Sequence, residues 1–182
     1  MKLICFVLFI WLCLGNSAVA QEKEKIKFSS INQAGFLKGS SDQTYQLQTI
    51  NGVKYKTWFA GIGVGLEEYY LKTIPVFIDV RKNLFEHKAS PFLYADLGIS
   101  FPSEKEDKGA WQMSVYNKGL YYDVGLGYNI PIKGSLAFNF SAGLSYKQLH
   151  EERTYWESFG GNGKEYFEYS FRRVSLKVAL QF

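Results

Sequence analysis

Side chains of two kinds alternate, position by position, along most of this chain. In the stretch WFAGIGVGLEEY, which begins at Trp58, apolar residues occupy every second position and the residues between them are small or polar. The same alternation recurs in TIPVFIDVR, FLYADLGISF, GLYYDVGLGYNI and SLAFNFSAGLSYK. A period of two is the period of a β-strand with two unlike faces, and no sustained apolar pattern of helical period accompanies it in residues 21–182. The sequence therefore predicts an all-β fold.

The number of alternating segments suggests a closed sheet. Two weaker strands precede those above, in KFSSINQAGFLKG and TYQLQTI, and another follows in RRVSLKVALQF. The total is about eight, an even number expected of a small up-and-down antiparallel barrel, in which closure removes the exposed edges of the sheet. We expect the last strand to pair with the first. Aromatic residues make up 18% of the chain, which also favours strands.

The faces of these strands indicate a barrel that spans a membrane. The polar face is rich in glycine, which suits a narrow and curved interior, while the other face carries large apolar residues that suit contact with lipid. The two longest connections, Pro102 to Lys118 and Gln148 to Glu168, fall on the same side, as the extracellular loops of outer-membrane barrels do. The turns at the other side are expected near Asn51 to Lys56, Lys82 to Ser90 and Pro131 to Gly134. The glycines of the polar face are Gly61, Gly63, Gly65, Gly98, Gly125, Gly127 and Gly143.

Residues 1–20 have the composition of a cleaved secretory signal peptide. Lys2 precedes a short apolar run, and the segment ends in Ala18, Val19 and Ala20. We therefore expect two parts, a signal peptide at 1–20 and a β-barrel domain at 21–182. Removal of Lys2 lowers the net charge from +4 to +3, which does not suggest a nucleic-acid partner. Both cysteines, Cys5 and Cys13, lie in the leader, so no cysteine-based metal site or nucleophile is expected in residues 21–182.

Together these segments resemble the small outer-membrane β-barrels of Gram-negative bacteria, the OmpA-barrel and OmpX-like group. The resemblance rests on the leader, the alternation throughout, and a last strand that ends in an aromatic residue. It implies an outer-membrane location, contact with outer-membrane lipid, and recognition of the last strand by the barrel-assembly machinery. The chain ends at the barrel, so no peptidoglycan-binding domain is expected. The residues of that implied assembly signal are Val174, Leu176, Val178, Leu180 and Phe182.

If the polar face lines the lumen, four acidic and four basic side chains meet there. Unpaired charges in a partly dry interior are costly, so we expect a network of ion pairs that fills the lumen. About eight strands leave room for side chains but not for an open pore. The residues of this predicted network are Glu67, Asp79, Arg81, Asp96, Asp123, Lys147, Arg173 and Lys177.

Two other functions are alternatives for a barrel of this kind. A lipid-modifying enzyme would need a nucleophile and a base, and the available residues are His150 and Ser158 with Glu151, Glu152 or Glu157. No hydrolase motif joins them, so no catalytic residue, metal site or cofactor is expected. A secreted, lipocalin-like barrel would bind a small apolar ligand, with its apolar face turned inward.

The alternation continues past the length needed to cross a bilayer on both sides of Gly160-Gly161-Asn162-Gly163. We expect the last two strands to project as a hairpin that displays aromatic side chains. Two interpretations stay open: a surface that binds a protein or glycolipid by strand addition or stacking, or a loop with no dedicated partner. The displayed aromatic residues are Tyr155, Trp156, Phe159, Tyr166 and Phe167.

Overall fold

The computed structural model describes residues 25–40, 42–68, 71–87, 89–108, 112–156 and 162–182. These residues form ten strands, all of them paired antiparallel. In this part of the chain there is no helix long and apolar enough to cross a membrane. The strands are β1 (Lys27–Lys38), β2 (Gln43–Tyr55), β3 (Trp58–Glu68), β4 (Lys72–Asn83), β5 (Ser90–Pro102), β6 (Glu106–Lys108), β7 (Gln112–Asn117), β8 (Gly119–Lys133), β9 (Leu136–Trp156) and β10 (Asn162–Gln181).

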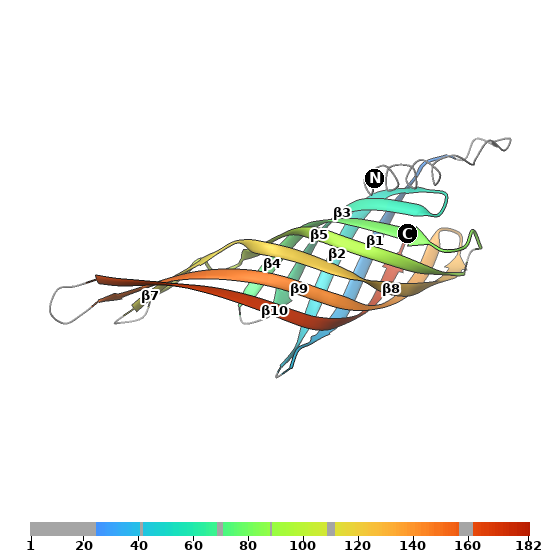
Figure 1. The fold of residues 1–182 in the computed structure, drawn as a ribbon. Helices are drawn as coiled ribbons and strands as arrows, with labels where there is room; N and C mark the ends of the chain where they lie inside the picture. The colour runs from blue at the N-terminus through green and yellow to red at the C-terminus, as the bar shows by residue number, and fades with distance from the viewer. Residues whose placement is uncertain (1–24, 41, 69–70, 88, 109–111, 157–161) are drawn as a thin grey trace, which may run out of the picture.

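Eight of the strands form a closed ring in the order β10-β1-β2-β3-β4-β5-β8-β9, and the pairing of β9 with β10 completes it. The first and last strands are paired from Ile31 and Gln181 to Lys38 and Val174, so the predicted closure is confirmed. The strands cross the barrel obliquely (Figure 1), and the first half of β1 lies beside the end of β10. The fold class predicted from the alternation, an antiparallel up-and-down barrel of eight strands, is therefore confirmed.

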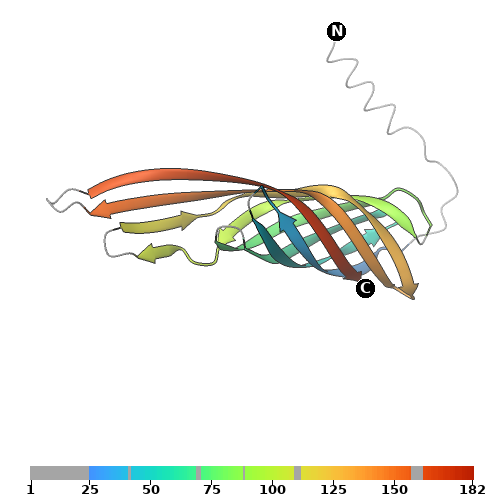
Figure 2. The ribbon, with the colours of Figure 1, turned by 90° about the horizontal axis from the view of Figure 1, so that it is seen from below.

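Part of the sheet extends beyond the barrel. Strands β9 and β10 contain 21 and 20 residues and run well past the other barrel strands, as predicted. The hairpin of β6 and β7 lies alongside, because β7 pairs with the outer part of β9 from Gln112 and Tyr155 to Asn117 and His150. The result is a four-stranded sheet, β6-β7-β9-β10, which we call the projecting sheet (Figure 2). The connection from Pro102 to Lys118, expected to be a loop, thus contains two of its strands.

The predicted turn near Asn51 to Lys56 is wrong. Strand β2 continues to Tyr55, because Asn51 and Gly52 pair with β1 on one side and with β3 on the other. Only Lys56 and Thr57 separate β2 from β3, and Lys56 adopts a positive φ of 55°. Similarly, β8 extends to Lys133, and Gly134 provides the positive φ of 63° that the next turn requires.

The apolar face of the barrel points outward and the polar face points inward, as predicted. On β8, Asp123 is fully buried whereas its neighbour Val124 is 42% exposed. The pattern holds on β10, where Val178 is 50% exposed and Lys177 is 3% exposed. These faces are the reverse of those that a soluble lipocalin-like barrel needs, so the structure contradicts that alternative.

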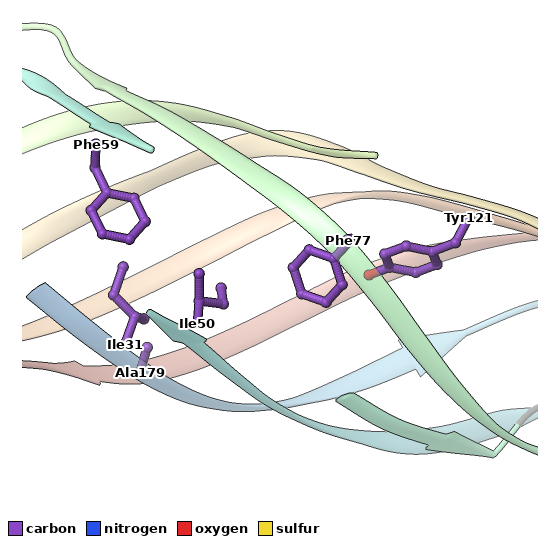
Figure 3. Packing of buried hydrophobic residues seen from close by; sticks show 6 residues of the cluster. All are labelled: Ile31, Ile50, Phe59, Phe77, Tyr121 and Ala179. Atoms are coloured by element: carbon purple, nitrogen blue, oxygen red, sulfur yellow. The ribbon is translucent and has the colours of Figure 1, made fainter. Parts of the chain in front are cut away.

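The interior also contains a small apolar cluster that the sequence analysis did not predict. Ile31, Ile50, Phe59 and Ala179 pack toward one end of the cluster, and the rings of Phe77 and Tyr121 lie at its other end (Figure 3). The Phe77 and Tyr121 ring centroids are 5.4 Å apart.

Glycines on neighbouring strands make room for the inward rings. Phe77 is paired with Gly63 on β3 and with Gly98 on β5. A Cβ atom added to Gly63 would lie 2.4 Å from the Phe77 ring, and one added to Gly127 would lie 2.4 Å from the ring of Phe92. At Gly63, Gly98 and Gly127, the space next to the glycine is therefore filled by an aromatic side chain from an adjacent strand.

Candidate functional site

Three aspartates stand side by side in the barrel interior. Asp79 on β4 is paired with Asp96 on β5, which is paired in turn with Asp123 on β8. Like charges at directly opposed positions repel one another, so this arrangement requires cations. Lys177 on β10 reaches them from another part of the ring, with its Nζ 2.9 Å from Asp123 Oδ2 and 3.5 Å from Asp96 Oδ2. Arg81 donates to Asp79 from Nε at 3.0 Å and from Nη2 at 2.8 Å.

A second ion pair spans the interior between β3 and β9. Lys147 Nζ lies 2.7 Å from Glu67 Oε2, and both side chains are at most 1% exposed. The other carboxylate oxygen of Glu67 accepts a hydrogen bond of 3.0 Å from Gln48 on β2. Lys147 Nζ also donates to Thr73 on β4. This pair therefore links four strands across the lumen.

The remaining predicted cation, Arg173, has a different partner. It lies at the rim of the barrel, where its Nη2 pairs with the carboxylate of Asp42 in the connection between β1 and β2. Seven of the eight predicted lumen charges thus fall in the two clusters above, and the eighth is paired with an acid that the sequence analysis did not include. Asp42 was missed because it belongs to a short connection rather than to a strand face.

Aromatic and hydroxyl side chains complete the charged interior. Tyr94 donates to Asp123 Oδ1 at 2.8 Å, and Ser175 donates to the same oxygen at 3.1 Å. Lys177 Nζ lies 4.3 Å from the centroid of the Tyr94 ring, a cation–π contact. Tyr121 accepts a hydrogen bond of 2.9 Å from Gln48. The two charge clusters are connected by glutamines, because Arg81 donates to Gln33 at 3.1 Å and Gln33 donates to Gln48, the partner of Glu67. The sequence signal for Tyr94 and Tyr121 was their alternation in phase with Asp96 and Asp123.

The charged interior leaves little empty space at one end of the barrel. Its charged side chains are buried and paired, and a cavity of about 10 Å³ lies at the end that contains Asn129, Asn139 and Gln181. Among the described residues, no group of three histidine, cysteine, aspartate or glutamate side chains is arranged to hold a metal ion.

The projecting sheet carries an aromatic ladder on the face that continues the barrel interior. Phe167, Tyr169 and Phe171 follow one another on β10 with ring centroids 6.3 Å apart at each step. The guanidinium carbon of Arg153 on β9 lies 4.7 Å from the Phe167 centroid. The Tyr169 hydroxyl donates to Glu151 Oε2 at 2.9 Å. These contacts hold β9 and β10 together beyond the barrel.

Glu151 is a buried carboxylate of the projecting sheet with several hydrogen-bond donors around it. Burial by itself raises its pKa, but hydrogen bonds from Ser114, Arg153 and Tyr169 outweigh that effect, so the pKa lies below its ordinary value. Arg153 Nη2 lies 2.8 Å from Glu151 Oε1. Because Ser114 is on β7, this one carboxylate joins three strands of the sheet.

The opposite face of the projecting sheet is polar. Tyr146 shares a hydrogen bond of 3.1 Å with Ser170, and Lys164 Nζ lies 2.6 Å from Glu152 Oε1. Both faces thus carry charged groups, which is typical of a sheet in water rather than in lipid.

Two of the residues considered for an enzyme, His150 and Glu151, fall on opposite faces of the projecting sheet. His150 is on the polar face, where its Nε2 lies 3.8 Å from Glu168, whereas Glu151 points to the aromatic face. Ser158 and Glu157 lie outside the described residues. In the part of the chain that the structure describes, His150 therefore has no serine beside it in a nucleophile and base arrangement.

The predicted surface aromatics fall on different faces. Tyr155 and Phe167 share the aromatic face, and Tyr155 donates to Glu165 at 2.9 Å. Tyr166 is on the opposite face and is 75% exposed. Phe159 and the side chain of Trp156 lie outside the described residues.

Comparisons with known proteins agree with the fold. No protein-family model matches the chain, and no curated protein matches it. The structure is similar to that of Neisserial surface protein A, with a TM-score of 0.56 and 13% identity over 87% of this chain and 98% of that one. It is also similar to the N-terminal β-barrel domain of Pseudomonas aeruginosa OprF (TM-score 0.51, 12% identity, 87% of this chain and 100% of that one). The outer membrane protein AlkL gives a TM-score of 0.54 at 10% identity, over 92% of this chain and 93% of that one. The chain therefore has the fold of the small outer-membrane β-barrels.

Proposed function

We propose that this chain, which has the fold of the small outer-membrane barrels, is an integral outer-membrane protein whose blocked barrel anchors the projecting sheet at the cell surface. The observation that carries the proposal is the reversal of faces, with apolar side chains outside and charged side chains buried inside. Water favours the opposite arrangement, whereas the hydrocarbon of a bilayer favours this one. Residues 1–20 are proposed to direct export as a cleaved signal peptide.

The height of the outer apolar surface supports membrane insertion. Aromatic side chains mark its two limits, with Phe36 and Tyr45 near the projecting sheet and Tyr55 and Trp58 at the other end. Tyr45 and Tyr55 are ten residues apart on β2. At about 3.4 Å per residue and a strand tilt of about 45°, this separation corresponds to about 24 Å along the membrane normal. Outer-membrane barrels have an apolar band of about 25 Å between aromatic girdles.

The packed interior supports an anchoring rather than a conducting role. The ion pairs of Lys147 with Glu67 and of Lys177 with Asp123 span the lumen between strands that are not neighbours in the ring. Passage of a solute would require these buried charges to separate, which leaves each of them uncompensated in a poorly hydrated space.

The projecting sheet is the proposed functional part. It extends beyond the barrel, carries charge on both faces, and includes aromatic side chains such as the exposed Tyr166. The part of β10 that precedes Val174 pairs with β9 only, so the other edge of this part has no described strand beside it. A protein segment that adds to this edge, or a glycolipid that stacks on the aromatic residues, suits such a surface.

The outward residues at the end of β10, together with Phe182 directly after it, are proposed as the segment read by the barrel-assembly machinery. In the folded barrel, Phe182 exchanges backbone hydrogen bonds of 2.8 and 3.1 Å with Ser30, next to the β1–β10 ladder. The assembly machinery would bind these residues before the barrel closes, and the same residues would pair with β1 after closure.

Three measurements on the full chain test the proposal. The protein should require detergent for extraction, migrate differently on gels with and without heating, and give no stable conductance steps in planar bilayers. Recovery in the soluble fraction would overturn the membrane assignment, and large stable steps would overturn the blocked lumen. Deletion of residues 152–165 should preserve the heat-dependent migration but abolish binding of the protein to its partner on cells. Loss of folding would contradict the proposal that the barrel folds independently of the projecting sheet.

A further inference from the structure

Four polar side chains interrupt the outward apolar surface, and all four lie on β1 and β2. They form two directly opposed pairs, Ser30 with Asn51 and Asn32 with Thr49. At the other outward positions of the described barrel strands, between the two aromatic girdles, the side chains are aliphatic, aromatic or proline. One sector of the barrel therefore differs in chemistry from the rest of the surface that contacts lipid.

This polar stripe lies near the middle of the apolar band. Thr49 is four residues from Tyr45 and six from Tyr55, which mark the two limits of the band on β2. Its hydroxyl donates a hydrogen bond of 2.9 Å to Asn32 Oδ1. Among the described residues, the amide nitrogen of Asn32 donates to no acceptor. Hydrocarbon provides no acceptor either, so an amide at this depth is costly without a polar partner.

One of the two pairs, Asn32 with Thr49, also borders a hollow on the outside of the barrel. This hollow has a volume of about 770 Å³; Asn32, Ala34 and Thr49 line it, as do larger residues such as Leu66 and Phe138. A second hollow of about 670 Å³ lies beside it and shares Ala34. Small residues allow close approach of another protein within a membrane, and polar residues there form hydrogen bonds across the interface.

We propose that a second copy of this chain docks on this face, with β1 and β2 of one protomer against β1 and β2 of the other. This inference rests on the membrane insertion proposed above. Two copies inserted in the same direction are related by an axis along the membrane normal, so identical residues meet at identical heights. The Asn32 carboxamide is both a donor and an acceptor, and therefore complements itself or Thr49 in such a dimer. Acyl chains fill the hollow but leave the amide unpaired.

Disulfide cross-linking in intact outer membranes tests the contact directly. Residues 21–182 contain no cysteine, so each single-cysteine variant reports one position. Asn32→Cys should give a dimer on mild oxidation. The matched control is Leu97→Cys, which is outward and 60% exposed near the middle of β5, across the ring from β1. It should stay monomeric. Equal cross-linking of both variants, or none at Asn32→Cys, would overturn the proposed interface.

The molar mass of the full chain in mild detergent provides the second measurement. Light scattering should give the mass of two chains for the wild type. Asn32→Leu combined with Thr49→Val should weaken the dimer about tenfold, because two symmetric hydrogen bonds are lost. A monomer, or a complex with a different protein, would overturn the inference. If the wild type also lacks heat-dependent migration on gels, the membrane proposal fails; if it retains that behaviour as a monomer, only the dimer fails.

Discussion

Removal of one partner of the Lys147–Glu67 ion pair should destabilise the barrel strongly. The 2.7 Å distance between the charged atoms corresponds to an attraction of about 6 kcal/mol at an effective dielectric constant of about 20. Much of this offsets the loss of hydration when both groups are buried. Lys147→Met keeps most of the side-chain volume but leaves the Glu67 carboxylate without its cation, and we expect a loss of about 3–5 kcal/mol in the free energy of unfolding.

A double-mutant cycle separates the pair from its surroundings. Glu67→Gln should cost a similar amount alone, because it leaves the Lys147 ammonium buried, whereas the two changes together should cost much less than their sum. The assay is urea unfolding of the protein in lipid vesicles, followed by tryptophan fluorescence. Lys164→Met is the matched control, because it breaks an ion pair of similar length that is exposed to water, and it should leave the midpoint unchanged. Additive and small effects of the two lumen changes would show a hydrated interior and refute the reasoning.

Three other predictions follow from individual residues. Gly63→Ala places a Cβ atom 2.4 Å from the Phe77 ring and should lower the free energy of unfolding by about 1–3 kcal/mol, whereas Gly163→Ala, with no atom within 4 Å, should not; equal midpoints in urea would contradict this. Because the pKa of Glu151 is lowered in the folded protein, its contribution to the stability of the projecting sheet is present above about pH 4.5 and is lost as the pH falls through the folded pKa. NMR titration of this carboxyl group should therefore give a midpoint below 4.5. A higher midpoint would refute the hydrogen-bonded geometry. Phe182→Ala should slow the appearance of the heat-modifiable form in pulse-chase experiments more than it lowers the stability of the assembled barrel, and equal losses would argue against a role in assembly.

The alternation was sufficient to predict the barrel strands because each strand here separates two very different environments. Val124 and Asp123 are adjacent in the sequence but lie on opposite faces of the sheet, one outward and one inward. The period of two is therefore visible in the sequence without any information about distant contacts. The inside and outside could be assigned because glycine marks a crowded interior. The number of strands in the ring followed from counting segments.

Pairing across the sheet was harder to predict. Asn51 and Gly52 have the composition of a turn, but both are held in β2 by ladders on each side. The short strand β7, QMSVYN, forms because β9 extends past the barrel and offers it an edge, which depends on the length of another strand. The pairing of Arg173 with Asp42 depends on the position of a connection. These features arise from contacts between distant segments and leave little trace in local sequence.

The inward aromatic residues carry a sequence signal for strand register. Phe77 and Tyr94 alternate with the outward apolar residues and so fall on the polar face, and Phe92 is in phase with Tyr94. Each is paired with a glycine on a neighbouring strand: Gly63 and Gly98 beside Phe77, Gly127 beside Phe92, and Gly125 beside Tyr94. Glycine on the inward face of one strand and an aromatic ring on the next is therefore a signal for register as well as for the interior.

The most direct test of the account is a scan of spin labels along β10 in reconstituted membranes. Single cysteines from position 174 to position 181 can be labelled one at a time, because residues 21–182 contain none, and the accessibility of each label to oxygen can be measured. We predict high oxygen accessibility, typical of lipid contact, at Val174, Leu176, Val178 and Leu180, and low accessibility at the positions between them. The opposite phase, or no alternation, would contradict a barrel with lipid outside and a charged core within.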